Sequence, residues 1–68
     1  MTKFKIHTET IQLAQLIKVM NISQSGGQAK LMIENGEVKV NGQLEYRKRT
    51  KLLRGDKIEI FDQYIEIE

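Results

Sequence analysis

The chain has no cysteine, no proline and no tryptophan, and aromatic residues make up only 6% of its 68 residues. The lack of cysteine excludes disulfides, zinc–thiolate sites and thiol nucleophiles, and it fits a reducing compartment. No apolar run approaches the ~20 residues that a membrane-spanning helix needs. The first residues also lack the apolar stretch of a signal peptide. These absences predict a soluble, cytoplasmic protein with no membrane partner.

The residues that are present are typical of a folded protein, with 40% hydrophobic and 29% charged residues. A chain of this length is expected to form a single domain over residues 1–68. The only histidine, His7, has no serine and aspartate arrangement beside it that would suggest catalysis. Glycine-rich nucleotide-binding motifs are absent as well. We therefore expect a protein without enzymatic activity, cofactor, metal or small-molecule substrate.

Apolar residues at three- and four-residue spacing predict a first amphipathic helix over about residues 11–20. Thr8 and Thr10 precede this stretch and are candidate N-caps. Asn21 follows it, and asparagine tolerates the left-handed conformation found at helix ends. The predicted apolar face consists of Leu13, Leu16, Ile17 and Met20.

A second helix is predicted over residues 26–34, with Ala29, Met32 and Ile33 on its apolar face. Ser25 and Gln28 have the spacing of a capping box at its start. The helix is expected to end at Asn35-Gly36, where glycine suits the positive φ of the C′ position. Isolated helices under ~12 residues are marginal, so the two helices are expected to pack against each other.

The rest of the chain predicts short strands. Alternating polar and apolar residues indicate strands at 3–7, 37–40, 57–61 and 64–67, with turns at 54–56 and 62–63. Asn41-Gly42 is typical of a type I′ hairpin turn. Residues 45–51 are expected to form a loop or irregular edge, after which Leu52-Leu53 enter the core. The last strand is expected to pair with the first. The resulting fold class is α+β, with two packed helices on a small, mostly antiparallel sheet.

Positive charge is concentrated in one segment, although the net charge is only +2. Residues 47–54 contain no acid and five cations: Arg47, Lys48, Arg49, Lys51 and Arg54. Acidic residues dominate from position 55 to the end. A local basic patch is an electrostatic footprint for polyanions. The alternative interpretation is a solvated loop that happens to be rich in lysine and arginine.

The segment from Ser25 to Gly42 closely resembles the core signature of the ribosomal protein S4-like, or Alpha-L motif, RNA-binding domain. That signature begins with a serine, which is followed by an alanine, an aliphatic pair, a glycine and then Val-x-Val-Asn-Gly. The matching positions are Ala29, Met32, Ile33, Gly36, Val38, Val40, Asn41 and Gly42. The stretch 53–58 is similar to the family's later turn and strand, with Arg54 where proline is usual. The resemblance covers about residues 10–60.

The resemblance implies a non-catalytic, cytoplasmic RNA-binding protein that contacts structured RNA, often ribosomal RNA or a ribosomal particle, in ribosome assembly or translation. The RNA-binding positions that it carries over are Ser25, Gln28, Lys30, Lys39 and Asn41. This sequence departs from the family at Gly26, where arginine is common, and Gly27 follows it. The pair of glycines looks like that of short, free-standing bacterial members.

A physical substitute for the missing arginine is the start of the second helix itself. Helix N-termini carry unpaired N–H groups and about half a positive charge, and Gly26 and Gly27 leave that backbone uncovered. Lys30 follows one turn later on the same face. We expect these groups, Lys39 and the basic segment 47–54 to form one continuous RNA surface, with Tyr46 available for stacking on a base. Two alternatives remain open: glycines chosen for close helix packing, and a protein–protein adaptor that has lost RNA affinity.

Overall fold

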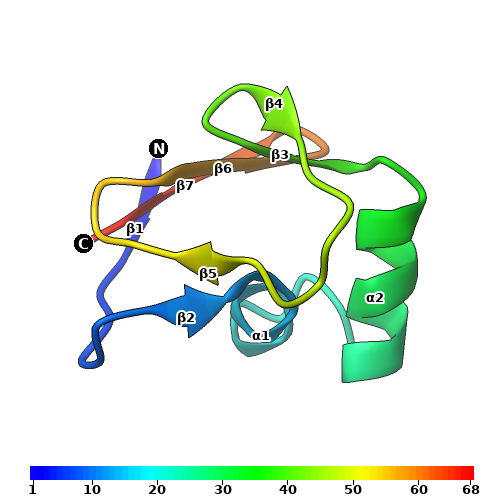
Figure 1. Cartoon of the computed structure of the whole chain (residues 1–68), viewed down its shortest axis with the longest axis horizontal. Helices are drawn as coiled ribbons and strands as arrows, with labels where there is room; N and C mark the ends of the chain where they lie inside the picture. The colour runs from blue at the N-terminus through cyan, green and yellow to red at the C-terminus, as the bar shows by residue number, and fades with distance from the viewer.

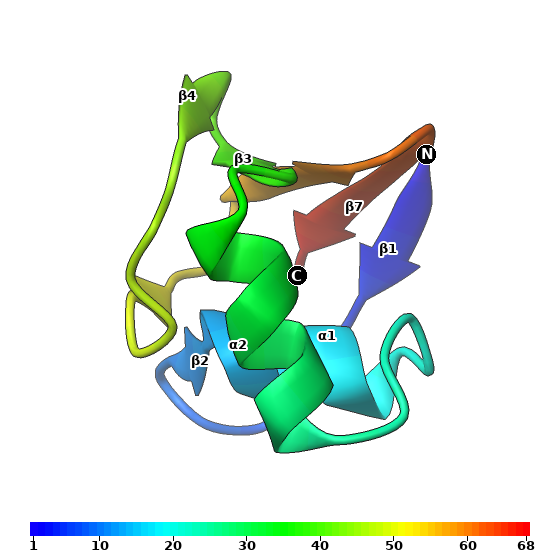
Figure 2. The ribbon, with the colours of Figure 1, turned by 90° about the vertical axis from the view of Figure 1, so that its right-hand side faces the viewer.

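The structure is a computed structural model that describes residues 1–68. Two helices lie on one side of a sheet, and they pack against each other (Figures 1 and 2). The elements in chain order are β1 (Thr2–Phe4), β2 (Ile11–Gln12), α1 (Leu13–Val19), α2 (Gly26–Glu34), β3 (Val38–Val40), β4 (Gln43–Leu44), β5 (Lys51–Leu52), β6 (Lys57–Ile60) and β7 (Gln63–Ile67). The expected α+β class with two packed helices is confirmed.

The main sheet has five strands in the order β1-β7-β6-β3-β4. All neighbouring pairs are antiparallel except β1 and β7, which run parallel with Phe4 opposite Ile67. The pairing of the first strand with the last is therefore confirmed, and both ends of the chain are tied into the sheet. A separate two-stranded sheet joins β2 to β5, with Ile11 opposite Leu52.

The core lies between the helices and the inner face of the sheet. Strand residues alternate between the two faces, so only every second residue of β6 and β7 points toward the helices. The buried hydrophobic residues are Ile6, Leu13, Leu16, Ile17, Ala29, Met32, Ile33, Val38, Leu52, Ile58, Ile60, Ile65 and Ile67. All the apolar positions predicted for α2, and three of the four predicted for α1, are in this set.

The start of the first helix differs from the prediction. Ile11 and Gln12 form β2, and neither threonine caps α1, whose N-cap Gln12 makes no side-chain cap bond. Instead, the N–H of Leu13 donates to the carbonyl of Thr50 at 2.9 Å, and the N–H of Ala14 donates to the carbonyl of Lys48 at 3.0 Å. The loop after β4 thus satisfies donors that a capping side chain normally satisfies.

The second helix has the predicted bounds. Ser25 Oγ accepts a hydrogen bond from the N–H of Gln28 at 3.1 Å, and Gln28 Oε1 accepts from the N–H of Gln24 at 2.7 Å. The Gln28 side chain therefore bonds the N–H of Gln24, one residue before the N-cap, whereas in a standard capping box it would bond the N–H of the N-cap itself. Gly36 has a φ of 78°, as predicted for the C′ position. Asn41 and Gly42 have φ values of 52° and 84°, which confirms the type I′ hairpin.

Three details of the last third of the chain were predicted wrongly. Lys51 belongs to β5 and not to the loop. Leu53 is exposed because Leu52 faces the core, and successive side chains of an extended chain point to opposite sides. The turn after β6 falls on Phe61 and Asp62, one residue earlier than expected, with Phe61 at a φ of 55°.

Candidate functional site

The first turn of α2 is uncovered. A Cβ added at Gly26 would meet nothing within 4 Å, and one at Gly27 would meet only Ser25 Oγ at 3.9 Å. Close packing between the helices, the alternative that the sequence left open, therefore does not explain the two glycines. Glycine within a helix costs roughly 0.5–1 kcal/mol relative to alanine. Because no contact in the fold offsets this cost, the bare helix start is a candidate for function.

Lys30 lies one turn after Gly26 on the solvent side of α2. Its ammonium is 4.0 Å from the Glu34 carboxylate, and both side chains are about half exposed. An exposed ion pair of this length contributes little. Lys30 is therefore available to a polyanion that approaches the start of the helix.

The basic segment forms a loop that leads from β4 toward β2 and the start of α1 (Figures 1 and 2). At one end the ring of Tyr46 lies against Gly36, where a Cβ would be 3.5 Å from Tyr46 Cε1. Farther along, the carbonyls of Lys48 and Thr50 hold the first N–H groups of α1. The structure thus places the loop against the end of one helix and the start of the other. Its exposed cations include Arg47 and Arg49.

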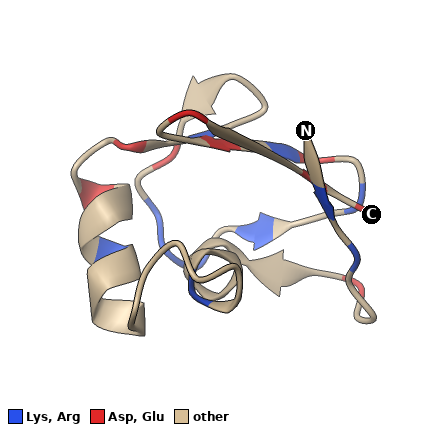
Figure 3. Ribbon diagram, turned by 180° about the vertical axis from the view of Figure 1, so that it is seen from behind, with Lys and Arg blue, Asp and Glu red and all other residues tan.

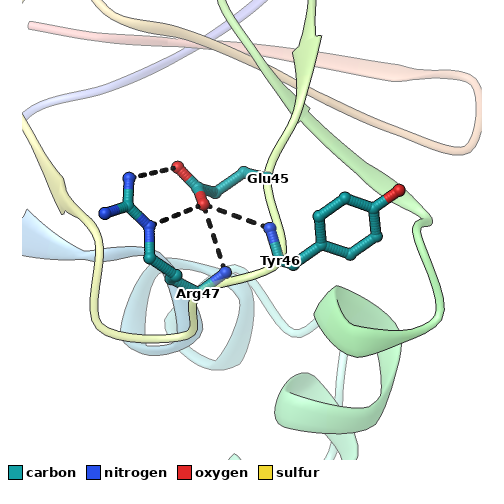
Figure 4. A network of polar contacts seen from close by, with 3 residues as sticks. All are labelled: Glu45, Tyr46 and Arg47. Atoms are coloured by element: carbon teal, nitrogen blue, oxygen red, sulfur yellow. Dashed lines mark hydrogen bonds and ion pairs between the residues drawn. The ribbon is translucent and has the colours of Figure 1, made fainter.

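Glu45 organises the beginning of this loop (Figure 4). Its Oε2 accepts hydrogen bonds from the N–H of Tyr46 at 3.1 Å, the N–H of Arg47 at 3.2 Å and Arg47 Nε at 3.2 Å. Its Oε1 accepts from Arg47 Nη2 at 3.4 Å. The side-chain hydrogen bond from Arg47 is the main cause that lowers the pKa of Glu45. The same bond raises the pKa of Arg47.

Glu45 was not among the residues predicted from the sequence. The only sequence signal for it is an acid two positions before the first arginine of the basic segment. Spacing alone does not show that the carboxylate folds back on the following N–H groups.

Asn41 and Arg54, like Ser25 and Gln28 at the start of α2, use their side chains for hydrogen bonds within the fold. Asn41 Nδ2 donates to Asp56 Oδ1 at 3.1 Å, and Asn41 Oδ1 accepts from the N–H of Lys57 at 2.9 Å. Arg54 Nη2 donates to the carbonyl of Ile6 at 2.9 Å. Asn41 joins the β3–β4 turn to the turn before β6, and Arg54 joins that second turn to the segment after β1.

Lys39 is not brought together with the other cations. Val38 is buried on the inner face of the sheet, so its neighbour Lys39 points to the outer face, away from the helices. There it lies opposite Glu59 on β6. Lys39 and Glu59 line a hollow of about 230 Å³ together with Gly36, Glu37 and Phe61. Glu37 and Glu59 lie near this lysine, whereas the loop cations lie between the end of α2 and the start of α1.

The ribbon shows where the charged residues lie (Figure 3). Blue segments mark the loop between β4 and β5, the middle of α2 and parts of the sheet such as β1, and red segments are interspersed with blue ones on the sheet and its connections. No group of three or more histidine, cysteine, aspartate or glutamate side chains could hold a metal ion. None of the helices has the length and apolar character needed to cross a bilayer.

A model of the S4 domain family matches residues 4–68. The chain belongs to the S4 domain family. This S4 domain is 37% identical over 57 residues to YbcJ of Escherichia coli K12, an alignment that covers 84% of this chain and 81% of YbcJ. It is 44% identical over 55 residues to a protein of Bacillus subtilis 168 named probable ribosome maturation protein RlbA, with 81% and 78% of the two chains covered.

Solved structures agree with this assignment. The solution structure of YbcJ, described as revealing an alfaL motif involved in RNA-binding, superposes with a TM-score of 0.74 at 34% identity. That match covers 98% of this S4 domain and 86% of YbcJ. The 30S ribosomal protein S4e of Thermoplasma acidophilum gives a TM-score of 0.69 at 26% identity over 84% of this chain and 30% of that protein. The fold is therefore that of the Alpha-L RNA-binding motif.

Proposed function

We propose that this S4 domain binds structured RNA, with ribosomal RNA or an assembling ribosomal particle as its target. The surface consists of the start of α2, Lys30 and the basic loop over residues 47–51. The RNA-binding motif of YbcJ and the ribosome maturation name of RlbA support the kind of target. The observation that carries the proposal is the basic loop, which hydrogen bonds hold against the start of α1; the uncovered start of α2 is the second part of the proposed surface.

The chemistry of this surface suits phosphate groups. Bare N–H groups at a helix start bind an anion through the backbone. Arginine side chains add bidentate contacts to phosphate oxygens. The ring of Tyr46 is 54% exposed and offers a face on which an unpaired base can stack. Phosphate contacts set affinity and orientation but carry no sequence information, so specificity would come from the shape of the RNA.

The test is binding to structured ribosomal RNA fragments in a salt titration. Log affinity should fall with log salt, with a slope near −0.7 to −0.9 for each neutralised phosphate. Replacing Arg47, Lys48 and Arg49 together with alanine should weaken binding and reduce the slope. Replacing Lys3, Lys5 and Lys57, three exposed cations outside this surface, with alanine removes the same charge and is the matched control. An unchanged affinity in the triple variant would remove the loop from the surface.

A second candidate function is that of a protein–protein adaptor. The outer face of the sheet favours it, because Met1, Leu44 and Tyr64 are each about half exposed or more there. Exposed apolar groups on one face mark protein contacts in other systems. Salt-insensitive co-purification with one protein, without retention on RNA, would support the adaptor and contradict RNA binding.

A further inference from the structure

The carboxylate of Glu45 occupies an anion site made by the loop itself. The successive N–H groups of Tyr46 and Arg47 point at one oxygen, together with Arg47 Nε. Successive backbone N–H groups that converge in this way form an anion-binding concavity. Here the anion comes from the preceding residue of the chain. The result is a turn whose shape depends on one acidic side chain.

The guanidinium of Arg47 keeps donors free in this arrangement. Arginine has five N–H donors, and Glu45 engages Nε and one N–H of Nη2. Three N–H groups therefore remain, including both on Nη1. The Arg47 side chain is 81% exposed, whereas that of Glu45 is 16% exposed. A phosphate can reach the outer edge of the guanidinium while the carboxylate holds the inner edge.

Because the Arg47 guanidinium is exposed, its ion pair with Glu45 contributes little to folding stability. The contact restricts the long Arg47 side chain, which has many rotamers, to one direction. Because this side chain is already ordered in the free protein, less conformational entropy is lost when RNA binds. The loop that follows is fixed by its carbonyl contacts to α1. Glu45 thus sets the entry of the loop, and α1 holds its far end.

We propose that Glu45 is a positioning residue of the RNA surface, which raises RNA affinity by holding Arg47 and the loop in the shape that binds phosphate. The inference rests on the proposed RNA-binding function. The expected effect of removing Glu45 on RNA affinity is opposite to the effect that net charge alone predicts. Removing an acid from a basic surface should strengthen binding to a polyanion, whereas removing this acid should weaken it.

The experiment compares Glu45→Ala with Glu9→Ala on a structured ribosomal RNA fragment at fixed salt. Both variants raise the net charge by one, and Glu9 lies in the exposed segment between β1 and β2. We expect E45A to bind at least about threefold more weakly than the unmodified protein, and E9A to bind equally or more tightly. E45Q should fall between, since an amide oxygen still accepts from the backbone but does not pair with the guanidinium.

Arg47→Lys provides a second arm, because lysine keeps the charge and loses the fork geometry. The losses from E45A and R47K should not add in the double variant, since both remove the same arrangement. If E45A binds as tightly as the unmodified protein, the positioning role is wrong while RNA binding stands. If the unmodified protein itself does not bind structured RNA, the proposed function fails instead.

A measurement on the free protein keeps the inference testable without RNA. In ¹⁵N relaxation experiments, residues 46 and 47 should be ordered in the unmodified chain and mobile on the nanosecond timescale in E45A, with the helices and residues 48–50 unchanged. A loop that stays equally ordered in E45A would overturn the positioning role, whatever the RNA affinities are.

Discussion

At the scale of single residues, Gly26 and Gly27 lower the stability of α2 but leave the backbone N–H groups at its start accessible. Both lie in the first turn of α2 with open space where a side chain would be. Alanine at each position should therefore stabilise the fold by up to roughly 0.5–1 kcal/mol, because glycine is the poorer helix residue and no clash arises. The same methyl groups should weaken RNA binding, since they keep phosphates away from the backbone N–H groups.

Urea denaturation and RNA titration of the G26A/G27A variant test both effects. Gly36→Ala is the control, because Gly36 has a φ of 78° and a Cβ there would also approach Tyr46. That substitution should destabilise the fold. If G26A/G27A is more stable and binds RNA unchanged, the bare helix start has no role in binding.

Glu45 predicts a pH dependence of stability with a definite sign. Its hydrogen bonds lower the pKa in the folded state below the value of about 4.3 for a free glutamate. A lowered folded pKa means that the stabilisation is fully present above the unfolded pKa and is lost as pH falls through the folded pKa. The unmodified protein should therefore lose more stability than E45Q between about pH 5 and the acid limit. Chemical denaturation at several pH values measures the difference, and identical pH profiles would contradict it.

At the scale of secondary structure, the Asn41 side chain links two turns that are 15 residues apart in sequence. Asn41→Gly keeps the positive φ of the hairpin and removes only the bonds to Asp56 and Lys57. We expect it to cost about 2 kcal/mol of stability, near the usual net value of two hydrogen bonds.

Urea denaturation of N41G, D56A and the double variant measures this link. Asp56 also accepts from the N–H of Leu53 at 2.8 Å. A bond to a charged carboxylate is stronger than the neutral Asn41–Lys57 bond that N41G removes, so D56A should cost more than N41G. The double variant should cost less than the sum of the two, because both remove the Asn41–Asp56 bond. Additive losses would show that the two turns are energetically independent, and would free Asn41 for an RNA contact.

The elements that were predicted well are those fixed by neighbouring residues. The second helix has its cap at Ser25 and its end at Gly36 within twelve residues, and the hairpin needs only Asn41-Gly42. The first helix begins where Lys48 and Thr50, which are 34 and 37 positions away from the residues they cap, accept its first hydrogen bonds, so local signals at Thr8 and Thr10 misled the prediction. Strand β2 likewise exists only because β5 pairs with it.

In the candidate site, too, features set by neighbouring residues were predicted and features set by distant parts of the chain were not. Helix periodicity placed Lys30 on the same side as the glycines, and the basic loop was visible as a charge cluster. Strand alternation turns Lys39 to the outer face, which composition alone does not reveal. The return of the Glu45 carboxylate onto Arg47 depends on the bend of the chain after β4.

At the scale of the whole molecule, the sheet separates two surfaces of different chemistry. One side presents the helices and the basic loop, and the outer side presents mixed charges with exposed apolar residues such as Leu44 and Tyr64. The molecule measures 26 × 22 × 18 Å, so both surfaces are within reach of a single large RNA. The dimensions therefore do not favour one side, and single substitutions on each side are needed to test which side contacts RNA.

Lys30 and Lys39 are matched probes of the two sides. Each is an exposed lysine, one on α2 and one on β3, and alanine at either position removes one positive charge. If RNA binds on the helix side, K30A should weaken binding at physiological salt and reduce the salt slope by nearly one unit, the value for one lost phosphate contact. K39A should leave the slope unchanged, because acidic neighbours surround Lys39. Equal reductions would mean that RNA wraps the sheet edge and contacts both sides, and a loss in K39A alone would place the RNA on the outer face.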